Sequence, residues 1–75
     1  MNNDRRHKLK KLLDAMQAIV NALEALKDEE DEVRENIPEN LETSDIYQES
    51  ERCSDLIDDA IYSVNEAMGN ISEIT

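Results

Sequence analysis

The chain has 75 residues with one glycine, one proline, no phenylalanine or tryptophan, and a formal net charge of −11. Domains of this size bury only about 60% of the surface that the unfolded chain exposes, so we expect one small domain that gains stability from a partner. A sandwich or barrel needs many more turn-forming residues, which excludes those folds and predicts an all-α chain.

Charge is distributed unevenly along the sequence. Residues 1–11 contain five basic side chains and one aspartate, whereas the other 64 residues contain 18 acidic and three basic side chains. An acidic surface repels nucleic acid and lipid head groups and attracts basic protein surfaces. We therefore expect a basic protein surface as partner, with no direct nucleic-acid or membrane binding. No apolar run is typical of a signal peptide or a transmembrane helix, which predicts a cytoplasmic location.

The first half of the chain has the periodicity of a helix. Its apolar residues are separated alternately by three and four positions, as in a coiled-coil heptad. They are Leu9, Leu12, Met16, Ile19, Leu23, Leu26, Val33 and Ile37. Glu30 interrupts the series at a seam position and is predicted to set the register or to mark a point where the helices splay.

The second half repeats this spacing. The series consists of Ile46, Ser50, Cys53, Ile57, Ala60, Val64, Ala67, Ile71 and Ile74. Pro38 biases the preceding residue away from helical geometry and ends the first helix, and Ser44 or Asp45 is the expected cap of the second. We predict one domain, residues 1–75, with a helix at about 4–36, a loop at 37–44 and a helix at 45–73. Cys53 is interpreted as a small core residue.

The two predicted helices have similar lengths, about 50 and 44 Å at 1.5 Å per residue, which favours an antiparallel hairpin. An apolar flank is expected to remain outside this pair. It consists of Leu13, Val20, Leu56, Ile61 and Met68. Burying each large apolar side chain stabilises by roughly 1.5–3 kcal/mol, so the flank predicts a homodimeric four-helix bundle. A larger partner with an apolar groove is the alternative.

Acidic residues recur at three- and four-residue steps on both predicted helices. The candidate partner-binding acids are Glu24, Asp28, Asp31, Glu35, Glu51, Asp55, Asp58 and Asp59. Neighbouring carboxylates on a helix repel by a few tenths of a kcal/mol per pair, so such rows reduce stability. They are interpreted either as a solvated face or as a surface that imitates a nucleic-acid backbone in a basic groove.

Catalytic and metal-binding patterns are weak. The acidic run 28–32 lacks the glycine of an EF-hand loop, and the only histidine, His7, forms no Glu-x-x-His pair. The sequence predicts no catalytic residue, metal or cofactor. A third hypothesis is a magnesium-dependent nucleotide pyrophosphohydrolase, because carboxylate pairs on neighbouring helices can hold Mg²⁺. The pairs would be Glu29 with Glu32 and Asp55 with Asp58.

The basic start of the chain has three interpretations: phosphate contact, anionic lipid contact, or pairing with the acidic end of a second subunit. Its cations are Arg5, Arg6, Lys8, Lys10 and Lys11. Pairing is the simplest, and within an antiparallel hairpin the same segment is expected beside Glu66 and Glu73.

Several short motifs carry a resemblance to a known group of proteins. They are Glu29-Glu30, Asn36-Ile37-Pro38-Glu39-Asn40-Leu41, Ser44, Glu51, and Leu56-Ile57 with Ala60-Ile61. Over residues 23–74 the chain resembles small acidic helical-hairpin accessory proteins of phages and prophages, while the basic start lies outside the resemblance. It implies a phage-encoded inhibitor of host defence or of host nucleic-acid enzymes, a class that includes anti-CRISPR proteins, acting in the host bacterial cytoplasm.

Three hypotheses for function follow. The first is a non-catalytic inhibitor that occupies a basic nucleic-acid-binding surface of a host defence protein. The second is a structural or assembly protein that works through its apolar flank. The third is the magnesium-dependent hydrolase.

Overall fold

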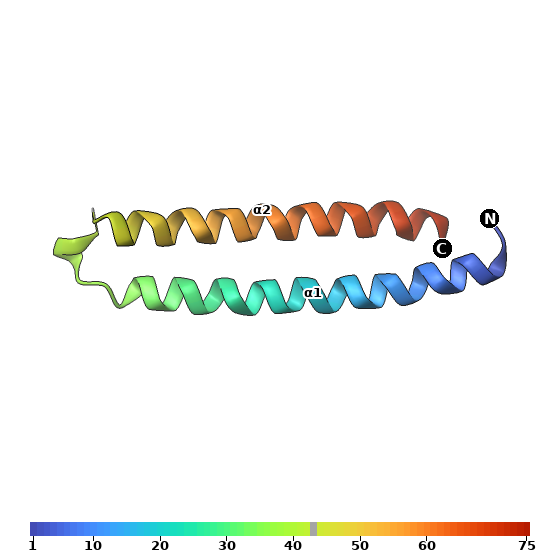
Figure 1. The fold of residues 1–75 in the computed structure, drawn as a ribbon, viewed down its shortest axis with the longest axis horizontal. Helices are drawn as coiled ribbons and strands as arrows, with labels where there is room; N and C mark the ends of the chain where they lie inside the picture. The colour runs from blue at the N-terminus through green and yellow to red at the C-terminus, as the bar shows by residue number, and fades with distance from the viewer. Residues whose placement is uncertain (43) are drawn as a thin grey trace.

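The protein is a hairpin of two long antiparallel helices. The computed structural model describes residues 1–42 and 44–75. Helix α1 (Asn3–Glu35) is followed by a short 3₁₀ turn, η1 (Glu39–Leu41), and by helix α2 (Asp45–Ile74). The two helices lie side by side in a rod of 59 × 15 × 12 Å (Figure 1). The predicted all-α hairpin is confirmed, while its pairing into a four-helix bundle stays a prediction.

The helix ends are set by capping side chains. Asn2 Oδ1 accepts a hydrogen bond from Arg5 N at 2.9 Å, which satisfies a free N–H group of the first turn of α1. Ser44 Oγ accepts from Tyr47 N at 3.2 Å, so Ser44 rather than Asp45 caps α2. The predicted bounds agree with the helices to within one residue. Position 43 of the predicted loop lies outside the described residues.

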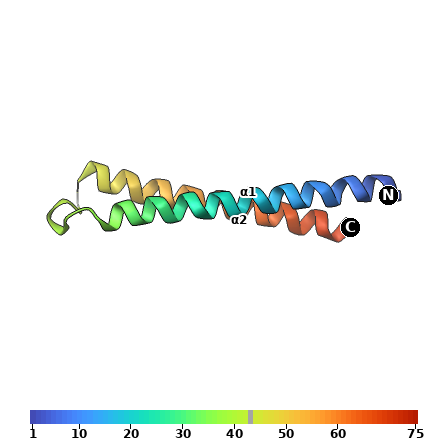
Figure 2. The ribbon, with the colours of Figure 1, turned by 90° about the horizontal axis from the view of Figure 1, so that it is seen from below.

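The helices are offset along the axis of the rod. Lys27 Nζ lies 3.7 Å from Asp58 Oδ2, so these residues are at the same height on the two helices. Because both helices rise by about 1.5 Å per residue, Lys11 is level with Ile74, the last residue of α2. The start of α1 therefore projects beyond α2, as Figure 1 shows at the N-terminal end. Turned by 90°, the helices cross at a shallow angle (Figure 2).

The apolar contact between the helices occupies the half of the rod away from the loop. Val20, 2% exposed, is the one buried apolar residue in the described part of the chain. The side chains around it are half-buried. They are Leu9, Leu13, Met16 and Leu23 of α1, with Ile57, Ile61, Val64, Met68 and Ile71 of α2. Two helices alone thus enclose very little.

The helices face each other along a different edge of the apolar stripe than the heptad predicted. Val20, expected outside the pair, is in the core, and Leu13, Ile61 and Met68 are half-buried beside it; the expected outside position is wrong for Val20. Leu56 remains outside at 49% exposed. The stripe on each helix is wider than two rows, and one neighbouring helix covers only one edge of it. Whether these five residues also self-associate stays a prediction.

The opposite edge of the stripe is exposed. The predicted seam residues Leu12, Ile19, Leu26 and Val33 are 54%, 52%, 54% and 63% exposed. Their expected position between the two helices was therefore wrong. None of the helices in the described ranges has a stretch long and apolar enough to cross a membrane.

Candidate interaction surfaces

A polar cluster joins the helices in the half of the rod near the loop. We define it as Lys27, Asp31 and Arg34 of α1 with Ser50 and Ser54 of α2. Arg34 Nη1 donates to Ser54 Oγ at 2.8 Å and to Ser50 O at 3.2 Å, while Arg34 Nη2 donates to Asp31 Oδ1 at 2.7 Å. Ser54 Oγ donates to the same Asp31 oxygen at 2.7 Å, and Lys27 Nζ donates to Asp31 Oδ2 at 2.9 Å.

The small serines make room for this cluster. Ser50 and Ser54 are 7% and 4% exposed, and at these positions an Arg34 guanidinium reaches across the gap between the helices. No buried side-chain nitrogen or oxygen of the described residues is left without a partner. Because a shift of one helix along the other would separate Ser54 from Arg34 and Asp31, we infer that the cluster favours this register of the hairpin.

The cluster perturbs the acid–base chemistry of its charged members. The hydrogen bond from Ser54, followed by those from Lys27 and Arg34, holds the pKa of Asp31 far below its usual 3.8. The hydrogen bond to Asp31 raises the pKa of Lys27 and that of Arg34. All three groups therefore stay charged at neutral pH, and Asp31 is committed to contacts within the hairpin.

An apolar groove runs between the helices on one side of the rod. Two adjoining hollows of about 400 and 390 Å³ form it. Their apolar lining consists of Leu26, Val33, Ile37, Ile46, Cys53 and Ile57. Leu26 and Val33 belong to the exposed row, and Leu12 and Ile19 continue that row beyond the hollows toward the open end, since residues seven apart share one side of a helix. We call this side the groove face.

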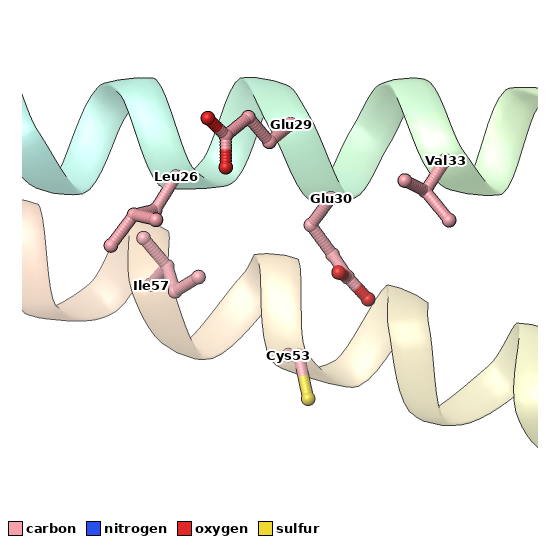
Figure 3. A pocket seen from close by; sticks show the side chains of 6 residues that line it. All are labelled: Leu26, Glu29, Glu30, Val33, Cys53 and Ile57. Carbon is pink, nitrogen blue, oxygen red and sulfur yellow. The ribbon is translucent and has the colours of Figure 1, made fainter.

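Four carboxylate residues line the groove, and Glu30 is the one that lines both hollows: they are Glu29, Glu30, Asp45 and Glu49. Leu26 and Ile57 approach each other across the helices, and the Glu30 side chain projects from α1 toward α2 (Figure 3). Among residues 1–42 and 44–75, none forms a hydrogen bond or ion pair with Glu30. Cys53, predicted to be a core residue, is half-buried at the groove, with Sγ 3.7 Å from Glu49 Oε1. Whether Glu30 sets the register or marks a splay of the helices stays a prediction.

The predicted partner-binding acids gather on the opposite side. Helical geometry of 3.6 residues per turn places six exposed carboxylates away from the groove, and none of them lines either hollow. We call these six the acidic face: Glu24, Asp28 and Glu35 of α1, with Glu51, Asp55 and Asp58 of α2. Asp31 is half-buried in the polar cluster, and Asp59 points away from α1 on the outer side of α2.

The carboxylate pairs of the hydrolase hypothesis do not gather. Within the described residues, no three His, Cys, Asp or Glu side chains converge as a metal site would require. Glu29 borders the groove, whereas Asp58 lies on the acidic face beside Lys27. The structure thus separates these residues onto two sides of the rod.

Only part of the basic segment lies where the hairpin argument placed it, because Lys11 is level with Ile74 near the end of α2. Arg5, Arg6 and Lys8 lie beyond the end of α2, so they do not flank Glu66 and Glu73. The ion pair of this segment in the described structure joins Lys8 Nζ to Asp4 Oδ2 at 3.1 Å, with both side chains 72% exposed. Arg5, Arg6 and Lys8 are therefore available to another chain.

No known protein family matches the sequence, and no characterised protein or solved structure matches it either. The resemblance to phage accessory proteins therefore stays a prediction.

The sequence reasoning missed the polar cluster, although a signal for it was present. Lys27 and Arg34 continue the seven-residue row of Leu13 and Val20, which is the row that enters the hairpin core. Two cations on a core row require polar partners on the facing helix, and Ser54 lies on the α2 row that includes Ile61 and Met68.

Proposed function

We propose that this hairpin is a non-catalytic binding module that associates through its groove face with another amphipathic helical surface. The exposed row Leu12, Ile19, Leu26 and Val33 carries the proposal, because its spacing is that of a helix packing seam and each side chain is more than half exposed. Scattered exposed apolar residues need no explanation, but a continuous row that leads into a groove is typical of an interaction site.

The shallow core supports the same proposal. Val20 alone is buried among the apolar side chains of the described residues, so the hairpin has gained little of the burial that stabilises folded domains. A helical partner lying in the groove would cover the exposed row and the apolar lining together. This proposal corresponds to the second functional hypothesis, a structural or assembly protein, but its binding surface is the groove face rather than the predicted apolar flank.

Site-specific photocrosslinking tests the proposal. A photoreactive phenylalanine analogue is placed at Ile19 on the groove face or, as a matched control, at Ala18 on the outer side of the same helix turn. We expect covalent adducts that contain a second polypeptide at position 19 and few at position 18, with little dependence on salt. Equal yields at the two positions, or none at either, would contradict binding through the groove.

A second candidate function uses the acidic face. We infer that it binds a basic protein surface, and in the phage context this would block a nucleic-acid-binding site of a host defence protein. The alignment of six exposed carboxylates from both helices favours this candidate. It is compatible with the first, since the two faces lie on opposite sides of the rod.

The second candidate predicts binding that weakens steeply with salt. Asp28→Lys should weaken capture of a basic host protein, because it reverses a charge on the acidic face. Glu29→Lys makes the same change in charge one residue away, beside the groove, and should have a smaller effect. Salt-independent binding, or equal loss from both variants, would reject the acidic face.

A further inference from the structure

We propose that the groove face binds a second copy of the same chain in antiparallel orientation, with the loop end of each hairpin against the open end of the other. This inference rests on the proposed function and names the occupant of the groove. The charge along the groove face, the symmetry of its exposed row and the surface left uncovered point to the same arrangement.

The two ends of the groove face carry opposite charge. Arg5 is seven residues before Leu12 and Lys8 is four residues before it, so both cations continue the exposed row toward the open end. At the other end, the groove is lined by Asp45 and Glu49. Stacking two copies in parallel would place like charges together at both ends, whereas the antiparallel arrangement places cations against carboxylates twice.

The heights along the rod agree with this pairing. We place the two-fold axis of the antiparallel pair midway between Ile19 and Leu26. Ile19 of each copy then faces Leu26 of the other, and Leu12 of each copy faces Val33 of the other. The same symmetry carries the projecting start of α1 to the loop end of the second copy, where α2 begins at Asp45. The segment of α1 that α2 leaves uncovered would thus lie on the other hairpin.

The ion pairs that Lys8 and Glu49 form within one hairpin would not prevent these residues from pairing with a second copy. Lys8 pairs with Asp4, and Glu49 pairs with Arg52 at 3.1 Å; all four side chains are more than 60% exposed. Exposed pairs of this kind contribute little to stability and rearrange readily.

The uncovered surface is also of the size a stable pair requires. The chain exposes 5706 Å², whereas a compact monomer of 8.6 kDa exposes about 4,700 Å² by the usual scaling with mass. The excess of about 1,000 Å² compares with the roughly 800 Å² that each partner buries in a standard protein interface. A second copy of equal length can cover the groove from end to end.

Disulfide trapping tests the orientation directly. Leu12→Cys and Val33→Cys are made in separate chains, each with Cys53→Ala, and the two proteins are mixed and mildly oxidised. These positions are about 30 Å apart along α1, so one alignment cannot satisfy both kinds of disulfide. We expect the mixed disulfide between position 12 of one chain and position 33 of the other, and a mass by light scattering of twice 8.6 kDa before oxidation.

Two results would overturn the inference, and they differ in what they leave standing. Disulfides between identical positions would show a parallel pair, which removes the orientation but retains association through the groove. A helical 8.6 kDa monomer at millimolar concentration would exclude the second copy. In that case, crosslinks from position 19 to a different protein would still support the proposed function, and their absence would remove that as well.

A charge test is independent of introduced cysteines. The double variant Arg5→Glu with Lys8→Glu should weaken dimerisation about tenfold or more, because four pairs across the interface become repulsive. Arg6→Glu with Lys10→Glu makes the same change in net charge on the acidic side of α1 and is the matched control. Equal weakening by both doubles would contradict specific contacts of Arg5 and Lys8. The Arg5→Glu, Lys8→Glu protein can also be mixed with an Asp45→Lys, Glu49→Lys protein. Recovery of binding in this mixture would confirm the contacts of Arg5 and Lys8.

Discussion

Arg34 Nη1 on α1 lies 2.8 Å from Ser54 Oγ on α2, so a short polar contact between the helices joins an arginine to a serine that is 4% exposed. The same guanidinium binds Asp31, which in turn accepts a hydrogen bond from Ser54. These three groups form a closed triangle of hydrogen bonds. A shift of either helix by one residue would break the two sides that join Ser54 to α1, so we infer that the cluster favours this register.

Loss of the serine hydroxyl is expected to destabilise the hairpin. Ser54→Ala leaves both Arg34 and Asp31 with one hydrogen-bond partner fewer in a half-buried site, at about 1–2 kcal/mol. For a domain of this size, this corresponds to roughly 4–16 °C in Tm, measurable by circular dichroism. Ser63→Ala removes the same hydroxyl from an exposed position of α2 and should change Tm little. Equal losses for both variants would argue against the cluster.

Acid should weaken the contribution of Asp31. Its pKa is held low in the folded state, chiefly by Ser54, so ionised Asp31 stabilises the fold above its unfolded pKa of 3.8. This stabilisation is lost progressively as the pH falls below about 4 toward the folded pKa. We therefore expect the stability difference between wild type and Asp31→Asn to be constant from about pH 5 to 8 and to shrink in stronger acid.

The control for this measurement is Asp28→Asn, on the exposed side of α1. Protonation of the many other carboxylates relieves repulsion in all these proteins alike, so the comparison uses differences between variants rather than absolute stabilities. A wild-type advantage over Asp31→Asn that grows below pH 4 would contradict the assigned interactions.

Two valines distinguish the hairpin core from the groove face. Val20→Ala removes two methyl groups from a side chain that is 2% exposed and should cost about 2 kcal/mol, including the space left behind. Val33→Ala removes the same atoms from a side chain that is 63% exposed, so in dilute, monomeric hairpin the loss should be a few tenths of a kcal/mol. Thermal unfolding across a range of protein concentrations measures both.

Protein concentration distinguishes the loss of stability in Val20→Ala from that in Val33→Ala. If a second copy covers the groove face, the loss caused by Val33→Ala grows with protein concentration while that of Val20→Ala persists on dilution. Equal losses in dilute protein would contradict the difference in burial.

Gly69 offers a stabilising substitution. It lies within α2, and a Cβ added there meets no atom within 4 Å. Gly69→Ala should therefore raise the free energy of unfolding by about 0.5–1 kcal/mol, because alanine loses less conformational freedom in a helix. Circular dichroism melts test this, and the dimerisation constant should be unchanged because residue 69 lies away from the groove face. A loss of stability would reveal an unrecognised packing partner at this position.

Much of the fold followed from local chemistry. The alternating three- and four-residue spacing required helices, Pro38 ended the first, and Ser44 was one of two expected caps for the second. These features depend on residues close together in the chain. The groove and the acidic face were less predictable, because each combines side chains from two helices whose rotation about their own axes is set by contacts between them.

Sequence by itself determined that the chain forms two helices of matched length, with apolar residues on one broad stripe and acids elsewhere. The tertiary structure decided which edge of that stripe is buried: Val20 turned inward and Ile19, its neighbour, turned outward. The physical reason is that a stripe of several rows offers more than one way to pack a pair of helices with similar apolar burial. The polar cluster selects among them, because Arg34 and Asp31 find their partners on α2 only when the helices are rotated to place Ser54 between them.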